Sequence, residues 1–231
     1  MIVDFKQKYD VRILQGWGMT EMSPLGSLTS FTRKMEDWPE EKQFDVMAKC
    51  GVPSTLVEMK IVDDEGRELP WDGKATGELL VKGPCVISAY YNSDERADAF
   101  TEDGWFHTGD VVSIDENSVL RISDRTKDLI KSGGEWISSV DMENAIMACP
   151  GVAESAVVAR PDPKWDERPV AFVVRAKDGA ELTGERIVAH LGQNFAKWQL
   201  PTPEDVRFVE EIPKTSVGKF DKKVLRERLP A

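Results

Sequence analysis

The chain changes character at Asp124-Arg-Thr-Lys-Asp-Leu-Ile-Lys-Ser-Gly-Gly-Glu-Trp136. Before this stretch, short strand-like runs are separated by turn residues, whereas after it strand and helix patterns alternate. The charge balance changes at the same point. Residues 1–123 carry 13 basic and 23 acidic side chains, and residues 124–231 carry 17 and 18. Such a shift indicates two structural units, with a boundary at residues 124–128.

The first unit is expected to be rich in β-strands. A helix end is expected at residues 1–9, a strand at 11–15, a surface excursion at 31–50 and a short helix at 94–100. Further strands are predicted at residues 56–62, 77–83, 111–114 and 119–122, the last two forming a hairpin. Short strands with turn signals favour a small barrel- or sandwich-like β unit over about residues 50–123.

The second unit alternates strands and helices. The Gly133-Gly134 pair predicts a hairpin between residues 128–132 and 135–138. Helices are expected from Ser139 to about Cys149, from Thr183 to Phe195 and from Asp221 to Leu229, and strands at 152–160, 170–175 and 206–209. The whole chain is therefore predicted to have a mixed α/β (α+β) fold, with a small α+β domain at residues 129–231.

The composition excludes several classes of protein. Of 231 residues, 41% are hydrophobic and 31% charged, and the net charge is −11. Excess acid argues against a general nucleic-acid or anionic-membrane partner, and no apolar run is long enough for membrane insertion. The start is polar within four residues, unlike a secretory signal. Three dispersed cysteines and two distant histidines disfavour disulfides and zinc. We expect a cytoplasmic protein.

Two segments of the first unit carry candidate binding residues. In Gln15-Gly-Trp-Gly-Met-Thr-Glu21, glycines allow close backbone approach while Trp17 stacks on a ligand, Thr20 meets a phosphate and Glu21 a magnesium ion. The alternative is a tight turn with a core tryptophan. In Gly104-Trp-Phe-His-Thr-Gly-Asp110, one carboxylate can accept hydrogen bonds from two hydroxyls of a ribose. The alternative is an Asp that closes a Thr-Gly turn.

Two segments of the second unit add candidates. At residues 124–136, Lys127, Leu129 and Lys131 would share one face of a strand, and the glycine pair leaves room for a thin ligand. The alternative is an exposed charged hairpin. In Ile212-Pro-Lys-Thr-Ser-Val-Gly-Lys219, a lysine after a flexible glycine can act as a mobile point charge. The alternative is a solvated basic tail. This interpretation is better supported for the helix that follows than for Lys219.

The four segments together resemble the adenylate-forming superfamily of acyl-CoA synthetases, peptide-synthetase adenylation domains and luciferases. The resemblance runs from about residue 10 to the end, with the motifs in the family's order. It is strongest to medium- and long-chain fatty acyl-CoA synthetases, through Gly-Trp-Gly-Met-Thr-Glu, Lys-Ser-Gly-Gly-Glu-Trp-Ile-Ser and Thr-Ser-Val-Gly-Lys-Phe-Asp-Lys-Lys. Four motifs in register are far more specific than one.

The resemblance implies nucleotide-binding roles in the first unit and at the boundary. Trp17 would stack on adenine, where many relatives have Tyr. Gly16, Gly18 and Met19 would supply backbone around the base and phosphate. Thr20 would contact the α-phosphate, and Glu21 would contact the Mg²⁺. Asp110 would hold both ribose hydroxyls, Ile122 would pack near the base, and Arg125 would bind the ribose.

The resemblance also implies that the second unit rotates. Lys127 would be the hinge in residues 124–128. Depending on the rotation, the nucleotide or the CoA arm would face Lys131, Gly133, Gly134, Glu135 and Trp136. Lys219 would be the catalytic lysine of the first half-reaction, with Lys131 as a second catalytic lysine. One site can use both segments only if the small domain swings.

The implied reaction is AMP-forming ligation of a carboxylic or fatty acid to coenzyme A. The acid attacks the α-phosphate of ATP, giving acyl-adenylate and pyrophosphate, and a thiol then displaces AMP; Mg²⁺ and lysine stabilise the developing charge. The implied partners are the acid, ATP and CoA, and a homodimer is left open.

The family's Ser/Thr/Gly-rich phosphate loop ending in Lys has no counterpart in this sequence. We therefore expect residues 1–123 to be the C-terminal part of the large AMP-binding domain, without its N-terminal half, and the chain alone to be inactive. Two alternatives remain: a non-catalytic nucleotide-binding or regulatory module, and a ligase of short thio- or aryl-alkanoates.

Overall fold

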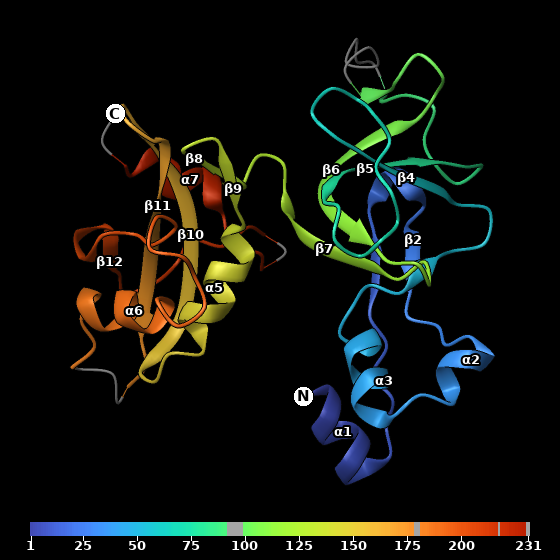
Figure 1. Cartoon of the computed structure of the whole chain (residues 1–231). Helices are drawn as coiled ribbons and strands as arrows, with labels where there is room; N and C mark the ends of the chain where they lie inside the picture. The colour runs from blue at the N-terminus through green and yellow to red at the C-terminus, as the bar shows by residue number, and fades with distance from the viewer. Residues whose placement is uncertain (92–98, 178–180, 217, 230–231) are drawn as a thin grey trace. The chain divides into compact units, whose positions relative to one another are not determined.

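The computed structural model describes residues 1–91, 99–177, 181–216 and 218–229 (Figure 1). The chain forms two compact units, Met1–Ser123 and Asp124–Ala231. Both mix helices with antiparallel sheet, as the α/β (α+β) prediction requires. No helix in these ranges is long and apolar enough to cross a membrane.

The first unit contains two sheets. The elements of its first half are α1 (Ile2–Tyr9), β1 (Gly16–Gly18), the 3-10 turn η1 (Thr20–Met22), β2 (Leu25–Leu28), α2 (Arg33–Glu36), α3 (Glu40–Met47) and β3 (Val52–Pro53). The second half contributes β4 (Glu58–Val62), β5 (Gly77–Lys82), β6 (Phe106–Ile114) and β7 (Leu120–Arg125). One sheet has the order β1-β2-β3 and the other β4-β5-β6-β7.

Four expectations for the first unit need correction or restriction. Residues 11–15 form no strand, because the pairing with β2 begins only at Gly16. The excursion at 31–50 contains α2 and α3. Most of the expected helix at 94–100 lies outside the described residues. The second sheet runs in a linear order within them, so its described ladder is an open meander and shows no barrel closure.

The second unit is one five-stranded sheet with helices. Its elements are β8 (Ile130–Ser132), β9 (Glu135–Ile137), α5 (Ser139–Met147), β10 (Val152–Asp162), β11 (Asp166–Arg175), α6 (Gly184–Leu191), the 3-10 turn η2 (Pro203–Asp205), β12 (Val206–Phe208) and α7 (Lys222–Glu227). The order is β10-β11-β8-β9, and β12 pairs in parallel with β11. Figure 1 shows α5 and α6 beside the long β10–β11 hairpin.

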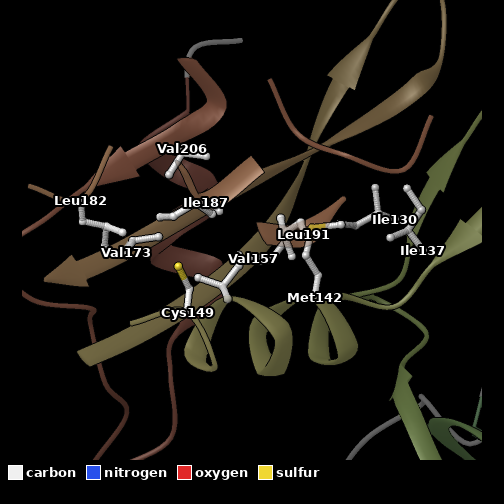
Figure 2. Close-up of a cluster of buried hydrophobic side chains, with 12 residues drawn as sticks. Ile130, Ile137, Met142, Cys149, Val157, Val173, Leu182, Ile187, Leu191 and Val206 are labelled. Atoms are coloured by element: carbon white, nitrogen blue, oxygen red, sulfur yellow. The ribbon is translucent and has the colours of Figure 1, made fainter. Parts of the chain in front are cut away.

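The larger buried cluster of the second unit lies between this sheet and two of its helices. Met142 and Ile146 from α5 meet Ile187 and Leu191 from α6 in one buried cluster, part of which is drawn in Figure 2. On β10, alternate residues belong to different clusters: Val157 packs with α5 and α6, while Ala156 and Val158 pack with Leu225 of α7. This period of two is the side-chain geometry of a strand buried on both faces.

Candidate functional site

Trp17 and Asp110 are directly hydrogen-bonded in the first unit. The indole Nε1–H of Trp17, on β1, donates to Oδ2 of Asp110, on β6, at 2.7 Å. Trp17 is 6% exposed and Asp110 is 3% exposed. A hydrogen bond to an ionised acceptor is stronger than one between neutral groups. This bond joins the two sheets of the unit.

The Trp17 ring is packed as a core side chain. A Cβ built on Gly26 would lie 2.2 Å from its Cζ3 atom, so the ring rests directly on the β2 backbone. Met19 and Ile122 pack against the same cluster as Trp17. The structure therefore brings together four candidates from distant motifs, and it buries the tryptophan as the core alternative expected.

Gly18 is needed for a close backbone approach. A Cβ at this position would lie 2.0 Å from the carbonyl oxygen of Pro24, and the N–H of Met19 donates to that same oxygen at 2.9 Å. Gly16 is exposed on the same strand, and Thr20 is exposed at the start of η1. The predicted backbone and hydroxyl positions are thus held on a tight, glycine-dependent turn.

Glu21 has a partner that the sequence did not reveal. Its Oε1 accepts a hydrogen bond from the Tyr90 hydroxyl at 2.9 Å, and its backbone carbonyl accepts from the N–H of Ile87 at 2.8 Å. A carboxylate oxygen suits Mg²⁺. Within the described residues, no three His, Cys, Asp or Glu side chains gather to hold a metal. By its chemistry, the Glu21 carboxylate fits such an ion as one ligand.

The segment before Asp110 is anchored on β5. The Thr108 hydroxyl donates to the carbonyl oxygen of Leu79 at 2.7 Å and accepts from the N–H of Asp110 at 3.1 Å. Glu78 accepts from the N–H of Gly109 at 3.2 Å and lies 2.9 Å from Nδ1 of His107. Glu78 was not among the predicted site residues, since only the strand pairing brings it beside this segment.

The hairpin β8–β9 is turned by Gly133 and Gly134, whose φ values are +62° and +85°. Positive φ at both central residues is what a two-residue type I′ hairpin requires. Lys131, Glu135 and Trp136 are exposed on this hairpin. The ammonium of Lys131 lies 5.6 Å from the centre of the Trp136 ring, within cation–π range.

The predicted shared strand face of Lys127, Leu129 and Lys131 is wrong. The N–H groups of Asp128 and Leu129 both donate to the carbonyl oxygen of Arg125, so residues 126–128 turn and the strand starts at Ile130. Arg125 and Lys127 are exposed beside this turn.

Lys219 lies on a separate exposed loop of the second unit. Lys214 and Phe220 form an isolated antiparallel bridge. The N–H of Thr215 donates to the carbonyl oxygen of Lys219 at 2.7 Å, and the N–H of Lys219 donates to the Thr215 hydroxyl at 3.2 Å. These bonds join Thr215 to Lys219, and Lys219 is exposed.

The solvated-tail alternative is wrong for two cations of α7. Lys222 Nζ lies 2.7 Å from Oε1 of Glu143, with side chains only 12% and 13% exposed. Arg226 pairs with Asp128 and also donates to the carbonyl oxygen of Lys127 at 2.9 Å. Burial raises the pKa of Glu143, although the charge of Lys222 opposes that rise. These contacts bind α7 to α5 and to the turn at 126–128.

The sequence matches two family models. Residues 2–91 match the AMP-binding enzyme, and residues 141–219 match the AMP-binding enzyme C-terminal domain. The two matches together cover most of the chain, and the match to the C-terminal domain follows the match to the AMP-binding enzyme.

Several known proteins are similar over nearly the whole chain. A long-chain-fatty-acid–CoA ligase of Thermus thermophilus is 49% identical over 224 residues, covering 96% of this chain and 41% of that protein. A 3-methylmercaptopropionyl-CoA ligase of Ruegeria pomeroyi is 43% identical over 228 residues, covering 99% and 41%. The ATP-bound crystal structure of MatB from Rhodopseudomonas palustris aligns with a TM-score of 0.82 at 31% identity, covering 98% and 42%.

The chain thus spans 41% of the length of these curated relatives. Both family models and relatives that are more than 40% identical over nearly the whole chain agree with the resemblance. The chain belongs to the AMP-binding enzymes, the adenylate-forming superfamily.

Proposed function

We propose that this chain supplies nucleotide- and CoA-facing residues of an AMP-forming acid–CoA ligase. The enzyme would join a carboxylic acid to ATP, releasing pyrophosphate, and then transfer the acyl group from AMP to the CoA thiol. The observation that carries the proposal is the exposure of two separate candidate segments in the second unit, the Lys131–Trp136 hairpin and Lys219. A module that merely binds AMP would need neither.

The first unit would hold the nucleotide. Asp110 would accept the ribose hydroxyls, and Thr20 would donate to the α-phosphate. Trp17, Met19 and Ile122 already pack in one cluster and would line the base, with backbone from Gly16 and Gly18. Glu21, positioned by Tyr90, would hold Mg²⁺, which when bound neutralises phosphate charge.

The second unit would serve both half-reactions by turning on residues 124–128, with Lys127 as the hinge and Arg125 meeting the ribose. Lys219 would stabilise the charge that develops in the first half-reaction. Lys131, Gly133, Gly134, Glu135 and Trp136 would contact the nucleotide or the CoA arm. At Gly134, an added Cβ would meet nothing within 4 Å, so the backbone there is open to close approach by a narrow ligand.

Further protein would complete the site. Relatives are more than twice as long, since the chain spans 41% of them. Large apolar side chains are exposed along the first 28 residues, including Val3, Phe5, Tyr9, Val11 and Leu28, and covering apolar surface is favourable. We propose that an N-terminal half covers this surface and supplies the acid pocket. A fatty acid is the favoured acid, and short thio- or aryl-alkanoates are the alternative.

A reducing compartment, and hence the cytoplasm, is proposed from the cysteines. Cys50, Cys85 and Cys149 are all free thiols. Burial raises the pKa of Cys50, so its reactive thiolate is disfavoured. Cysteines that form no disulfides are typical of intracellular proteins.

Calorimetry of AMP binding, with ATP–pyrophosphate exchange, tests the proposal. The 231-residue chain should bind AMP, Asp110→Ala should bind it at least tenfold more weakly, and no acid should promote exchange. Absence of AMP binding would overturn the nucleotide role. Acid-dependent exchange by this chain alone would overturn the need for a further half. An N-terminally completed protein that binds AMP but forms no CoA thioester would instead favour the regulatory module.

A further inference from the structure

We propose that Trp17 acts on the nucleotide through Asp110, as a positioning residue whose indole N–H orients the carboxylate for the ribose. This inference rests on the proposed function, in which Asp110 binds the ribose hydroxyls. It assigns to Trp17 a hydrogen-bonding role distinct from stacking on the base.

The hydrogen bond is short and enclosed. The Nε1–Oδ2 distance is 2.7 Å, with Trp17 6% and Asp110 3% exposed. A buried carboxylate is costly unless it is hydrogen-bonded, and indole nitrogen is a donor only. Trp17 is therefore suited to hold the ionised form of Asp110. Phenylalanine has no donor to replace it, and tyrosine carries its hydroxyl at the far end of a six-membered ring.

The rest of the ring is also held in place. The benzo edge of Trp17 rests on Gly26, where an added Cβ would lie 2.4 Å from Cε3. Two edges of the ring are therefore fixed, one by β2 backbone and one by the carboxylate on β6. Trp17 is only 6% exposed, so its ring is held in place before a ligand binds. By contrast, Trp136 is 45% exposed.

Asp110 is restrained from its backbone side as well. Its N–H donates to the Thr108 hydroxyl at 3.1 Å, and that hydroxyl donates to the carbonyl oxygen of Leu79 at 2.7 Å. An ionised carboxylate has about four acceptor positions, so accepting from Trp17 is compatible with accepting from ribose hydroxyls. A carboxylate fixed before binding loses less conformational freedom when the ligand arrives.

Two nucleotides distinguish this role from stacking. Affinities of the 231-residue chain for AMP and for 2′,3′-dideoxy-AMP would be measured for the unmodified chain and for Trp17→Phe. Loss of a charge-assisted bond should weaken AMP binding about tenfold. Dideoxy-AMP lacks the hydroxyls that Asp110 would accept, so its affinity should change less than about twofold. Equal losses for both ligands would overturn the inference and support stacking.

Controls separate the hydrogen bond from general core damage. Trp38→Phe changes a tryptophan that packs with a different cluster and should leave both affinities unchanged. In an Asp110→Asn background, Trp17→Phe should cause no further loss of AMP affinity, whereas additive losses would contradict the coupling.

A spectroscopic readout does not depend on the ligand. The indole N–H resonance of Trp17, assigned by its loss in Trp17→Phe, should shift in Asp110→Asn, while the Trp38 resonance should not. An unshifted Trp17 resonance would overturn the inference. Failure of the unmodified chain to bind AMP would instead overturn the proposed function.

Discussion

Asp124 caps helix α5 through Ser139. Its Oδ2 accepts hydrogen bonds from the backbone N–H of Ser139 at 2.5 Å and from the Ser139 hydroxyl at 2.7 Å. Asp124 is 2% exposed and Ser139 is fully buried. A carboxylate at a helix N-terminus satisfies unpaired N–H groups and interacts favourably with the helix dipole. The first residue of the second unit is thereby tied to its first helix.

Asp124→Ala should lower the free energy of unfolding of the second unit by about 2 kcal/mol, because it leaves the buried N–H and hydroxyl of Ser139 without their acceptor. Denaturant unfolding followed by circular dichroism measures this loss. Glu211→Ala, at an exposed acid of the same unit, is the matched control and should change stability by less than about 0.5 kcal/mol. Equal losses of unfolding free energy in the two variants would show that the contacts of Asp124 with Ser139 do not stabilise the unit.

Lys222→Met should destabilise the second unit by about 3 kcal/mol at neutral pH, because the enclosed carboxylate of Glu143 loses its cation. Glu143→Gln in the same chain removes that stranded charge. The double variant should therefore be more stable than Lys222→Met alone in denaturant unfolding. A double variant no more stable than the single one would contradict the coupling of these side chains.

The pH dependence of stability should carry the signature of Glu143. Burial raises the pKa of this carboxyl above its ordinary value of 4.5, so the folded chain binds the proton more tightly than the unfolded chain. The stability that this proton contributes is present below pH 4.5 and is lost as pH rises through the raised pKa. Relative to Glu143→Gln, the unmodified chain should thus lose unfolding free energy between acidic and neutral pH. If the unmodified chain instead gained unfolding free energy relative to Glu143→Gln as pH rises, this direction would be contradicted.

Gly133 and Gly134 make a matched pair for testing the hairpin turn. Both have positive φ, and a Cβ on Gly133 would lie 2.9 Å from Cε3 of Trp165, whereas a Cβ on Gly134 meets nothing within 4 Å. Left-handed backbone costs a side chain about 1 kcal/mol. Gly134→Ala should lose about that much stability, and Gly133→Ala more, about 2 kcal/mol, since the ring must move. The reverse order in thermal or denaturant unfolding would show that the turn has another geometry.

Much of the fold follows from local patterns that the sequence displays. The Gly133-Gly134 turn was predicted correctly because only glycine readily takes two successive positive φ values. The cap by Thr183, which accepts a hydrogen bond from the N–H of Arg186, is likewise a local signal. The prediction failed where strand pairing depends on residues that are distant in the sequence. Residues 11–15 have strand-like composition, but the ladder with β2 includes only Gly16–Gly18.

The site was predictable in its motifs but not in its contacts. The glycines around Trp17 indicate a close backbone approach, yet nothing local shows that the indole would meet Asp110, 93 residues further along the chain. Tyr90 and Glu78 carry no motif signal of their own, and their roles depend on tertiary packing. Lys222 and Arg226 lie in a basic run that is typical of a solvated tail, and only the structure reveals their partly buried acidic partners.

A chimera tests the central claim most directly: this chain would replace the matched C-terminal portion of the Thermus thermophilus ligase, to which it is 49% identical. Acid-dependent formation of CoA thioester with release of AMP would be measured, with Lys219→Ala as the inactive comparison and Lys223→Ala, at an exposed lysine of α7, as the active one. We predict thioester formation by the chimera and its Lys223 variant and a loss of at least a hundredfold in the Lys219 variant. A folded chimera that binds AMP but forms no thioester, or one indifferent to Lys219, would contradict the account.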